Sequence, residues 1–124
     1  MARILLIEDD DAVRTTLRLI LEHVGHTVIE ARDGTEGLAL FQHATADLVI
    51  TDIVMPETEG FEVLRELRST HPPVKIIAIS GAGRDSGADY LQMAKHLGAS
   101  TVLAKPFSAD VLIAAINELL PGGT

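Results

Sequence analysis

Polar side chains that could carry phosphate chemistry follow several short apolar runs of the chain. Residues 8–11 (Glu-Asp-Asp-Asp) come directly after the first run, while Asp52, Ser80 and Lys105 each follow a later one. Carboxylate oxygens are ligands for Mg²⁺, and a carboxylate can also act as a nucleophile that takes up a phosphoryl group. A lysine ammonium and a hydroxyl can hold the other oxygens of that group and offset their charge. Gathered in one place, these residues could transfer a phosphoryl group to a carboxylate with the help of Mg²⁺.

The elements that would position these residues alternate between short apolar runs and amphipathic stretches. Apolar runs predict strands, and apolar residues at helical spacing predict helices. The strands are expected at residues 3–7, 27–29, 47–51, 74–79 and 101–104, and the helices at about 12–24, 34–43, 61–71, 88–97 and 109–120. Continuously apolar strands separated by single helices indicate a parallel sheet that is buried on both faces. Five such units predict an α/β fold, the flavodoxin-like, doubly wound sheet of five parallel strands with five helices.

In an open parallel sheet, ligands bind at the carboxyl ends of strands, near the point where the strand order reverses. Each candidate residue also has a simpler explanation. Asp10 and Asp11 could cap a helix, Asp52 and Ser80 could belong to turns, and Lys105 could be a solvated loop lysine. All of them follow strands in an order that would bring them to one rim of the sheet. This joint occurrence favours a shared site.

Four segments of the chain together resemble one protein family. They are Ile7-Glu8-Asp9-Asp10, Asp52-Ile53-Val54-Met55-Pro56 with Gly60 shortly after, Ser80, and Lys105-Pro106-Phe107. In these segments, and over essentially its whole length, the chain resembles the receiver domains of two-component response regulators. The resemblance implies a phospho-acceptor rather than a conventional enzyme, although such a domain could catalyse its own phosphorylation from small donors and its own dephosphorylation.

The resemblance also implies a set of metal-binding roles. Asp52 would be the phosphoryl acceptor, and Mg²⁺ would be bound by Asp9, by Asp52 and by the backbone carbonyl of Val54. Glu8 would act through a metal-bound water. The residue pattern itself indicates that Glu8 and Asp9 point to different sides of a strand end, so that only one of them touches the metal directly.

Further roles implied by the resemblance concern the phosphoryl group and the partners. Ser80 and Lys105 would contact the phosphoryl oxygens, and Pro106 would help to direct the lysine into the site. A sensor histidine kinase or a phosphotransfer protein would be the donor, while the downstream effector stays open. Receiver domains often carry an aromatic residue on the fifth strand that turns inward on activation, but the matching residue here is Val102.

Composition limits the remaining choices. The chain has 124 residues, a formal net charge of −8 and no cysteine. We expect one domain over residues 1–120, with residues 121–124 as a tail or the start of a linker. An acidic chain without a basic cluster argues against direct nucleic-acid binding, and no apolar stretch is long enough to span a membrane. We therefore expect a cytoplasmic domain that contacts other proteins and could form a weak homodimer.

Two alternatives remain open at this point. Asp9-x-Asp11-x-Val13 also fits the first motif of haloacid-dehalogenase-like phosphatases, with Asp9 as nucleophile and Asp11 as general acid. Against it, no acidic motif follows Lys105, and the segment that begins at Asp52 would have no role. The second alternative is a receiver-like module that binds partners without phosphorylation. It is disfavoured because every acid of the expected site is present.

Overall fold

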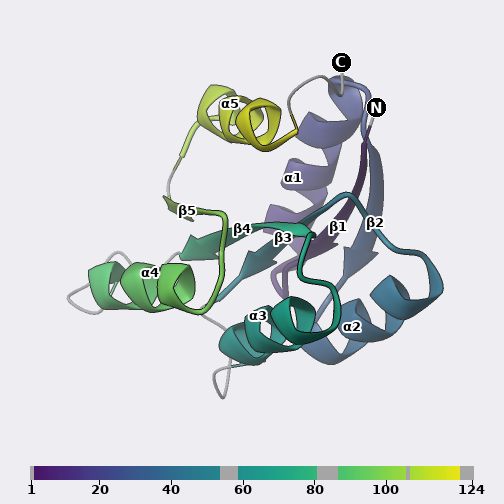
Figure 1. The fold of residues 1–124 in the computed structure, drawn as a ribbon. Helices are drawn as coiled ribbons and strands as arrows, with labels where there is room; N and C mark the ends of the chain where they lie inside the picture. Colours follow the sequence, from purple (N-terminus) through teal and green to yellow (C-terminus); the bar gives the residue numbers. More distant parts are fainter. Residues whose placement is uncertain (1, 54–58, 81–86, 106, 121–124) are drawn as a thin grey trace.

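The structure is a computed structural model that describes residues 2–53, 59–80, 87–105 and 107–120. Within these ranges, five strands form one parallel sheet in the order β2-β1-β3-β4-β5 (Figure 1). The strands are β1 (Arg3–Ile7), β2 (Thr27–Ala31), β3 (Leu48–Asp52), β4 (Lys75–Ser80) and β5 (Thr101–Ala104). The chain passes from β1 outward to β2 and then returns to β3 on the other side of β1. This reversal confirms the predicted doubly wound, flavodoxin-like fold.

Helices cover both faces of the sheet. They are α1 (Asp11–His23), α2 (Gly34–His43), α3 (Glu59–Thr70), α4 (Gly87–His96) and α5 (Ala109–Leu119). One face carries α1 and α5, and the other carries α2, α3 and α4 (Figure 1). Alternate residues of β1 pack into the two layers, with Leu5 and Ile7 in one core cluster and Ile4 and Leu6 in the other. No helix in the described ranges is long and apolar enough to cross a membrane.

Capping residues determine where the helices begin and end. The side chain of Asp10 accepts a hydrogen bond from the backbone N–H of Val13 at 3.0 Å, so α1 begins directly after residues 8–10, the acidic loop. Ser108 caps α5 in the same way, through the N–H of Val111 at 3.1 Å. Gly25 follows α1 with a φ of 99°, a conformation that favours glycine. All five helices lie within about two residues of their predicted positions, so these predictions are confirmed.

A glycine allows α2 to pack closely on β1. A Cβ atom at Gly37 would lie 2.5 Å from Cδ1 of Ile7, which is too short for a real contact. Ile7 is the last residue of β1, directly before Glu8. The missing side chain at Gly37 therefore lets α2 support the end of the strand that leads into the acidic loop.

β2, β3 and β4 extend further at their carboxyl ends than the apolar pattern predicts, and β4 does so by one residue, to Ser80. β2 continues to Ala31, because Glu30 and Ala31 pair through their backbones with the end of β1. β3 includes Asp52, which is paired with Ile79 of β4. Backbone pairing does not depend on side-chain polarity, so the apolar runs do not reveal it. The extension places Asp52 on a strand rather than in a loop.

Candidate functional site

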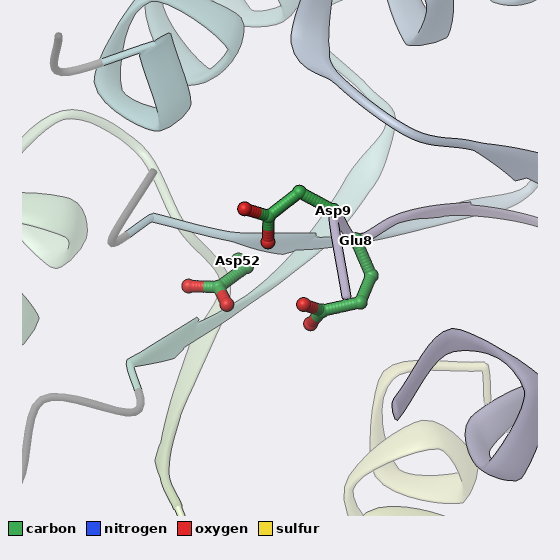
Figure 2. A group of neighbouring side chains, drawn as sticks. All are labelled: Glu8, Asp9 and Asp52. Carbon is green, nitrogen blue, oxygen red and sulfur yellow. The ribbon is translucent and has the colours of Figure 1, made fainter. Parts of the chain in front are cut away.

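Three carboxylates converge at the carboxyl ends of β1 and β3 (Figure 2). Glu8 and Asp9 directly follow β1, and Asp52 is the last residue of β3. Each residue offers one carboxylate oxygen, and these oxygens all lie within 4.8 Å of one another. The two strands are neighbours in the sheet, with Ile7 paired to Thr51, so the residues that come next reach the same rim. The gathering of acids expected from the sequence is present.

Burial distinguishes the three acids. Glu8 is 2% exposed and Asp52 is 5% exposed, whereas Asp9 is exposed to solvent. A buried carboxylate loses its hydration and is stable as an anion only where cations or hydrogen-bond donors compensate. The two buried acids therefore require positive charge close by.

Lys105 supplies such a charge. Its Nζ lies 3.1 Å from Oδ2 of Asp52 and 3.3 Å from Oε1 of Glu8. Lys105 directly follows β5, which is separated from β3 by β4, so the long lysine side chain spans the gap. One ammonium does not balance three carboxylates. The site therefore keeps an excess of negative charge that favours a further cation.

The protonation of Glu8 reflects this crowding. Burial, followed by the negative charge of Asp52, raises the pKa of Glu8 from 4.5 to about 7, although the backbone N–H of Asp10 and the ammonium of Lys105 act in the opposite direction. Burial lowers the pKa of Lys105, but the charges of Asp52 and Glu8 outweigh it, and the net shift is upward. Lys105 therefore stays protonated at neutral pH, while Glu8 is close to its midpoint.

The donor set fits Mg²⁺. This ion prefers oxygen ligands at about 2.1 Å in octahedral geometry, so that two ligand oxygens lie about 3 to 4 Å apart. The oxygens of Glu8, Asp9 and Asp52 lie within 4.8 Å of one another, which is close to that spacing. Carboxylates without nitrogen or sulfur ligands are typical of Mg²⁺ rather than of zinc.

The other two acids that follow β1, Asp10 and Asp11, have structural roles. Asp10 caps α1, and Asp11 forms an ion pair with Arg14 at 2.6 Å. The helix cap considered for these two acids is therefore confirmed for Asp10, whereas Asp11 lies in the first turn of α1 and pairs with Arg14 instead. Glu8 and Asp9 leave the backbone in different directions, as expected, and Glu8 is buried whereas Asp9 is exposed (Figure 2). Their carboxylates nevertheless both approach Asp52. That only one of them touches the metal directly stays a prediction.

Three other predicted site residues are described only in part or not at all. Ser80 is the last residue of β4, where its backbone is in register with Ala104 of β5, at the same rim as the acids. Val54 and Pro106 lie outside the described residues, as do residues 81–86. The proposed roles of Ser80, Val54 and Pro106 therefore stay predictions.

One residue beside the site was not expected from the sequence. Nη1 of Arg14, in the first turn of α1, donates a hydrogen bond of 2.9 Å to the backbone carbonyl of Glu8. The spacing of Arg14 from Asp11 indicates only an ordinary ion pair on a helix surface. A contact with a backbone carbonyl leaves no mark in the pattern of residue types.

Comparisons with known proteins agree with this geometry. A family model described as the response regulator receiver domain matches residues 4–117. The sensor kinase CckA of Brucella abortus is 41% identical over 121 residues, which cover 96% of this chain. The response regulator MprA of Mycobacterium sp. (strain KMS) is 39% identical over 118 residues, which cover 95% of this chain.

Solved structures show the same similarity. A response regulator receiver domain protein from Clostridium thermocellum has 34% sequence identity and a TM-score of 0.88, with 97% of this chain and 94% of the other covered. A CheY-like receiver domain protein from Methanospirillum hungatei has 30% identity and a TM-score of 0.86, again with 97% of this chain and 94% of the other covered. By contrast, the chain spans about half the length of MprA, at 50%, and 12% of CckA.

Proposed function

The chain belongs to the response regulator receiver domains, and from this premise we propose that Asp52 is the residue that accepts the phosphoryl group. A phospho-acceptor of this family is a switch rather than a conventional enzyme. The observation that carries the proposal is the position of Asp52 at the end of β3. There its carboxylate lies among Glu8, Asp9 and Lys105 at the point where the strand order reverses.

The surroundings of Asp52 suit a nucleophile for phosphoryl transfer. One carboxylate oxygen would form a bond to phosphorus while the bond from phosphorus to the donor breaks, and the electron pair of that bond leaves with the donor. Lys105 would hold a phosphoryl oxygen, since its ammonium already lies 3.1 Å from Oδ2 of Asp52. The hydroxyl of Ser80 would bind another oxygen, and Pro106 would help to direct Lys105.

The proposal includes Mg²⁺ as cofactor. Asp9, Asp52 and the carbonyl of Val54 would bind the ion directly, and Glu8 would act through a water. When bound, the ion neutralises charge on the incoming phosphoryl group. The proposed donor is a sensor histidine kinase or a phosphotransfer protein, because the relatives include a sensor kinase and response regulators. The effector that reads the switch and the cytoplasmic location stay predictions.

The phosphatase alternative is not supported. It would make Asp9 the nucleophile and Asp11 the general acid, but Asp11 is paired with Arg14. It also leaves unexplained why Asp52 is buried beside Lys105. A receiver-like module that binds partners without phosphorylation has the same geometry, and only a chemical test separates it from a phospho-acceptor.

Incubation with a small acyl phosphate provides that test. We expect the intact mass to increase by one phosphoryl group when Mg²⁺ is present, and not when it is chelated. Asp52→Asn should abolish the increase, while Asp110→Asn, an exposed carboxylate in the first turn of α5, serves as the matched control. Full labelling of Asp52→Asn together with loss in Asp9→Asn would make Asp9 the nucleophile. No labelling of the wild type would favour the module without phosphorylation.

A further inference from the structure

Arg14 connects α1 and β2 to the acidic loop. Its Nη1 donates to the backbone carbonyl of Glu8 at 2.9 Å, and its Nη2 donates to the carboxylate of Asp11 at 2.6 Å. Its Nε donates to the carboxylate of Glu30 in β2 at 3.2 Å. The side chain is only 12% exposed. A planar guanidinium with several directed donors can make all three contacts at once, which a lysine cannot.

The contact with Glu8 fixes a peptide group. The backbone N–H of Glu8 donates to the carbonyl of Ala31 at 3.0 Å, and the carbonyl of Glu8 accepts from Arg14. That carbonyl belongs to the same planar unit as the N–H of Asp9. The orientation of this plane determines how the Cα atoms of Glu8 and Asp9 are placed, and hence where both side chains start.

Such a contact is needed because β1 ends at Ile7. The pairing of β1 with β2 ends with the hydrogen bond from the N–H of Glu8 to Ala31, so the carbonyl of Glu8 lies beyond it. Glu8 is held further by Lys105, and Oε2 of Glu8 accepts from the N–H of Asp10 at 3.2 Å. Asp9 is exposed, so packing contributes little to its direction. The peptide group that Arg14 holds joins Glu8 to Asp9, so this one hydrogen bond helps to orient both residues.

We propose that Arg14 is a positioning residue for the magnesium site, and that it directs the carboxylates of Glu8 and Asp9 towards Asp52 through the Glu8 carbonyl. The proposal rests on the proposed function, because it assumes that these carboxylates bind Mg²⁺. Groups that orient metal ligands without touching the metal typically change metal affinity by roughly 10- to 100-fold when they are removed.

The sign of the effect separates positioning from charge. Arg14 is a cation, so by electrostatics alone its removal makes the loop more negative and strengthens the binding of Mg²⁺. As a positioning residue, its removal weakens binding, because the two carboxylates are no longer directed at the site. The two roles therefore predict opposite changes in the dissociation constant.

Arg14→Met and Arg18→Met form a matched pair for the experiment. Arg18 lies one turn further along α1 and pairs with Glu22 and Glu30, at 3.0 Å and 3.1 Å, so its removal changes the net charge by the same amount. NMR spectra of ¹⁵N-labelled protein would be recorded without metal and then during titration with MgCl₂. We expect a dissociation constant for Mg²⁺ raised roughly tenfold in Arg14→Met and changed less than about twofold in Arg18→Met.

The metal-free spectra provide a readout that does not depend on Mg²⁺. The amide signal of Asp9 should shift in Arg14→Met and stay in place in Arg18→Met, since its peptide group loses its donor only in the first variant. Arg14→Lys keeps the charge and serves as a second variant in case Arg14→Met does not fold. Like Arg14→Met, it should shift the amide signal of Asp9 and weaken the binding of Mg²⁺. Loss of affinity without a change at Asp9 in either Arg14 variant would overturn the proposal.

The outcomes also separate this proposal from the proposed function. Unchanged or tighter Mg²⁺ binding in Arg14→Met, with a wild type that binds Mg²⁺ and is labelled at Asp52, overturns the role of Arg14 alone. A wild type that neither binds Mg²⁺ nor is labelled contradicts the proposed function itself.

Discussion

Glu8 is buried beside Asp52, and burial followed by that neighbouring charge raises its pKa from 4.5 to about 7. In the unfolded chain the carboxyl group returns to its ordinary pKa. Between these two values the folded state binds more protons than the unfolded state, so the free energy of unfolding falls as the pH rises. The contribution of Glu8 to stability is therefore fully present below about pH 4.5 and is lost as the pH rises through 7.

We expect Glu8→Gln to remove this pH dependence from the metal-free protein. The amide does not ionise, so between about pH 5 and about pH 7.5 the variant should lose less stability than the wild type, by on the order of 1–3 kcal/mol. Urea unfolding at a series of pH values in the presence of a chelator measures the difference. Glu118→Gln, an exposed residue of α5, is the control. Identical pH slopes in the wild type and Glu8→Gln would show that Glu8 titrates like an exposed glutamate.

Residue type and place after a strand are enough to predict which side chains meet at the site. Glu8, Asp9, Asp52 and Lys105 all follow or end strands, and the fold brings them to one rim. Strand alternation predicts the different directions of Glu8 and Asp9, but it does not predict that both carboxylates approach Asp52. The role of Arg14 could not be predicted either, since a backbone carbonyl as partner has no signature in the sequence.

At the scale of elements, the end of the sheet opposite the acids is held by Arg68 in the last turn of α3. Its Nε donates to the carbonyl of Gly98 at 2.7 Å, and its Nη1 donates to the carbonyls of Pro72 and Val74, both at 2.6 Å. Gly98 has a φ of 119°, and a Cβ atom there would lie 2.5 Å from Cγ of Arg68. One side chain therefore ties the turn before β4 to the turn before β5.

Arg68→Met should destabilise the domain by roughly 2–4 kcal/mol, because several carbonyls lose a charged donor at once. Arg65→Met, an exposed arginine on the same helix, should change the free energy of unfolding by less than about 0.5 kcal/mol. Urea unfolding of the three proteins measures both effects. The Mg²⁺ affinity of Arg68→Met should equal that of the wild type, since the site is at the other end of the strands. Equal stability of the two variants would contradict a structural role for Arg68.

The elements that follow the site are expected to transmit its state. Ser80 ends β4 in register with Ala104 of β5, so a displacement of the Ser80 backbone reaches β5 directly. Val102, half-buried on β5, packs against the core and has no ring to rotate. We therefore expect a signal to pass through the backbone and the flanking helices rather than through a ring at this position.

Addition of beryllium trifluoride, a mimic of the phosphoryl group, should change NMR shifts beyond the metal site. We expect the changes to include α4, β5 and α5, within residues 88–120. Spectra of wild type and Asp52→Asn, each with Mg²⁺ and with or without the mimic, provide the comparison. Shifts confined to the acids and Lys105 would show that the fourth and fifth units do not respond.

For the whole molecule, the alternation of apolar runs with amphipathic stretches is sufficient to predict the fold. The five strands and five helices of the described residues lie within a few residues of their expected positions. The ends of β2, β3 and β4 differ because polar or small residues beyond the apolar runs join the sheet through backbone pairing, which apolar patterning does not record. These residues are Glu30, Ala31, Asp52 and Ser80. The order of the strands follows from the fold class rather than from any single segment.

The central claim is that the folded chain brings Glu8, Asp9 and Asp52 into one magnesium site, and thermal unfolding with and without Mg²⁺ tests it most directly. A ligand that binds only the folded state stabilises it by about 1.4 kcal/mol at ten times its dissociation constant, which corresponds to about 5 °C for a domain of this size. We expect the wild type to gain this much beyond a control with Na⁺ at equal ionic strength.

Variants of the acids make the measurement specific. Without metal, Asp9→Asn should melt above the wild type because one repelling charge is gone, while Asp52→Asn also loses its contact with Lys105 and should stay close to the wild type. Both variants should gain less from Mg²⁺ than the wild type does. Equal melting temperatures for all three proteins, with no response to Mg²⁺ in any of them, would contradict a shared site.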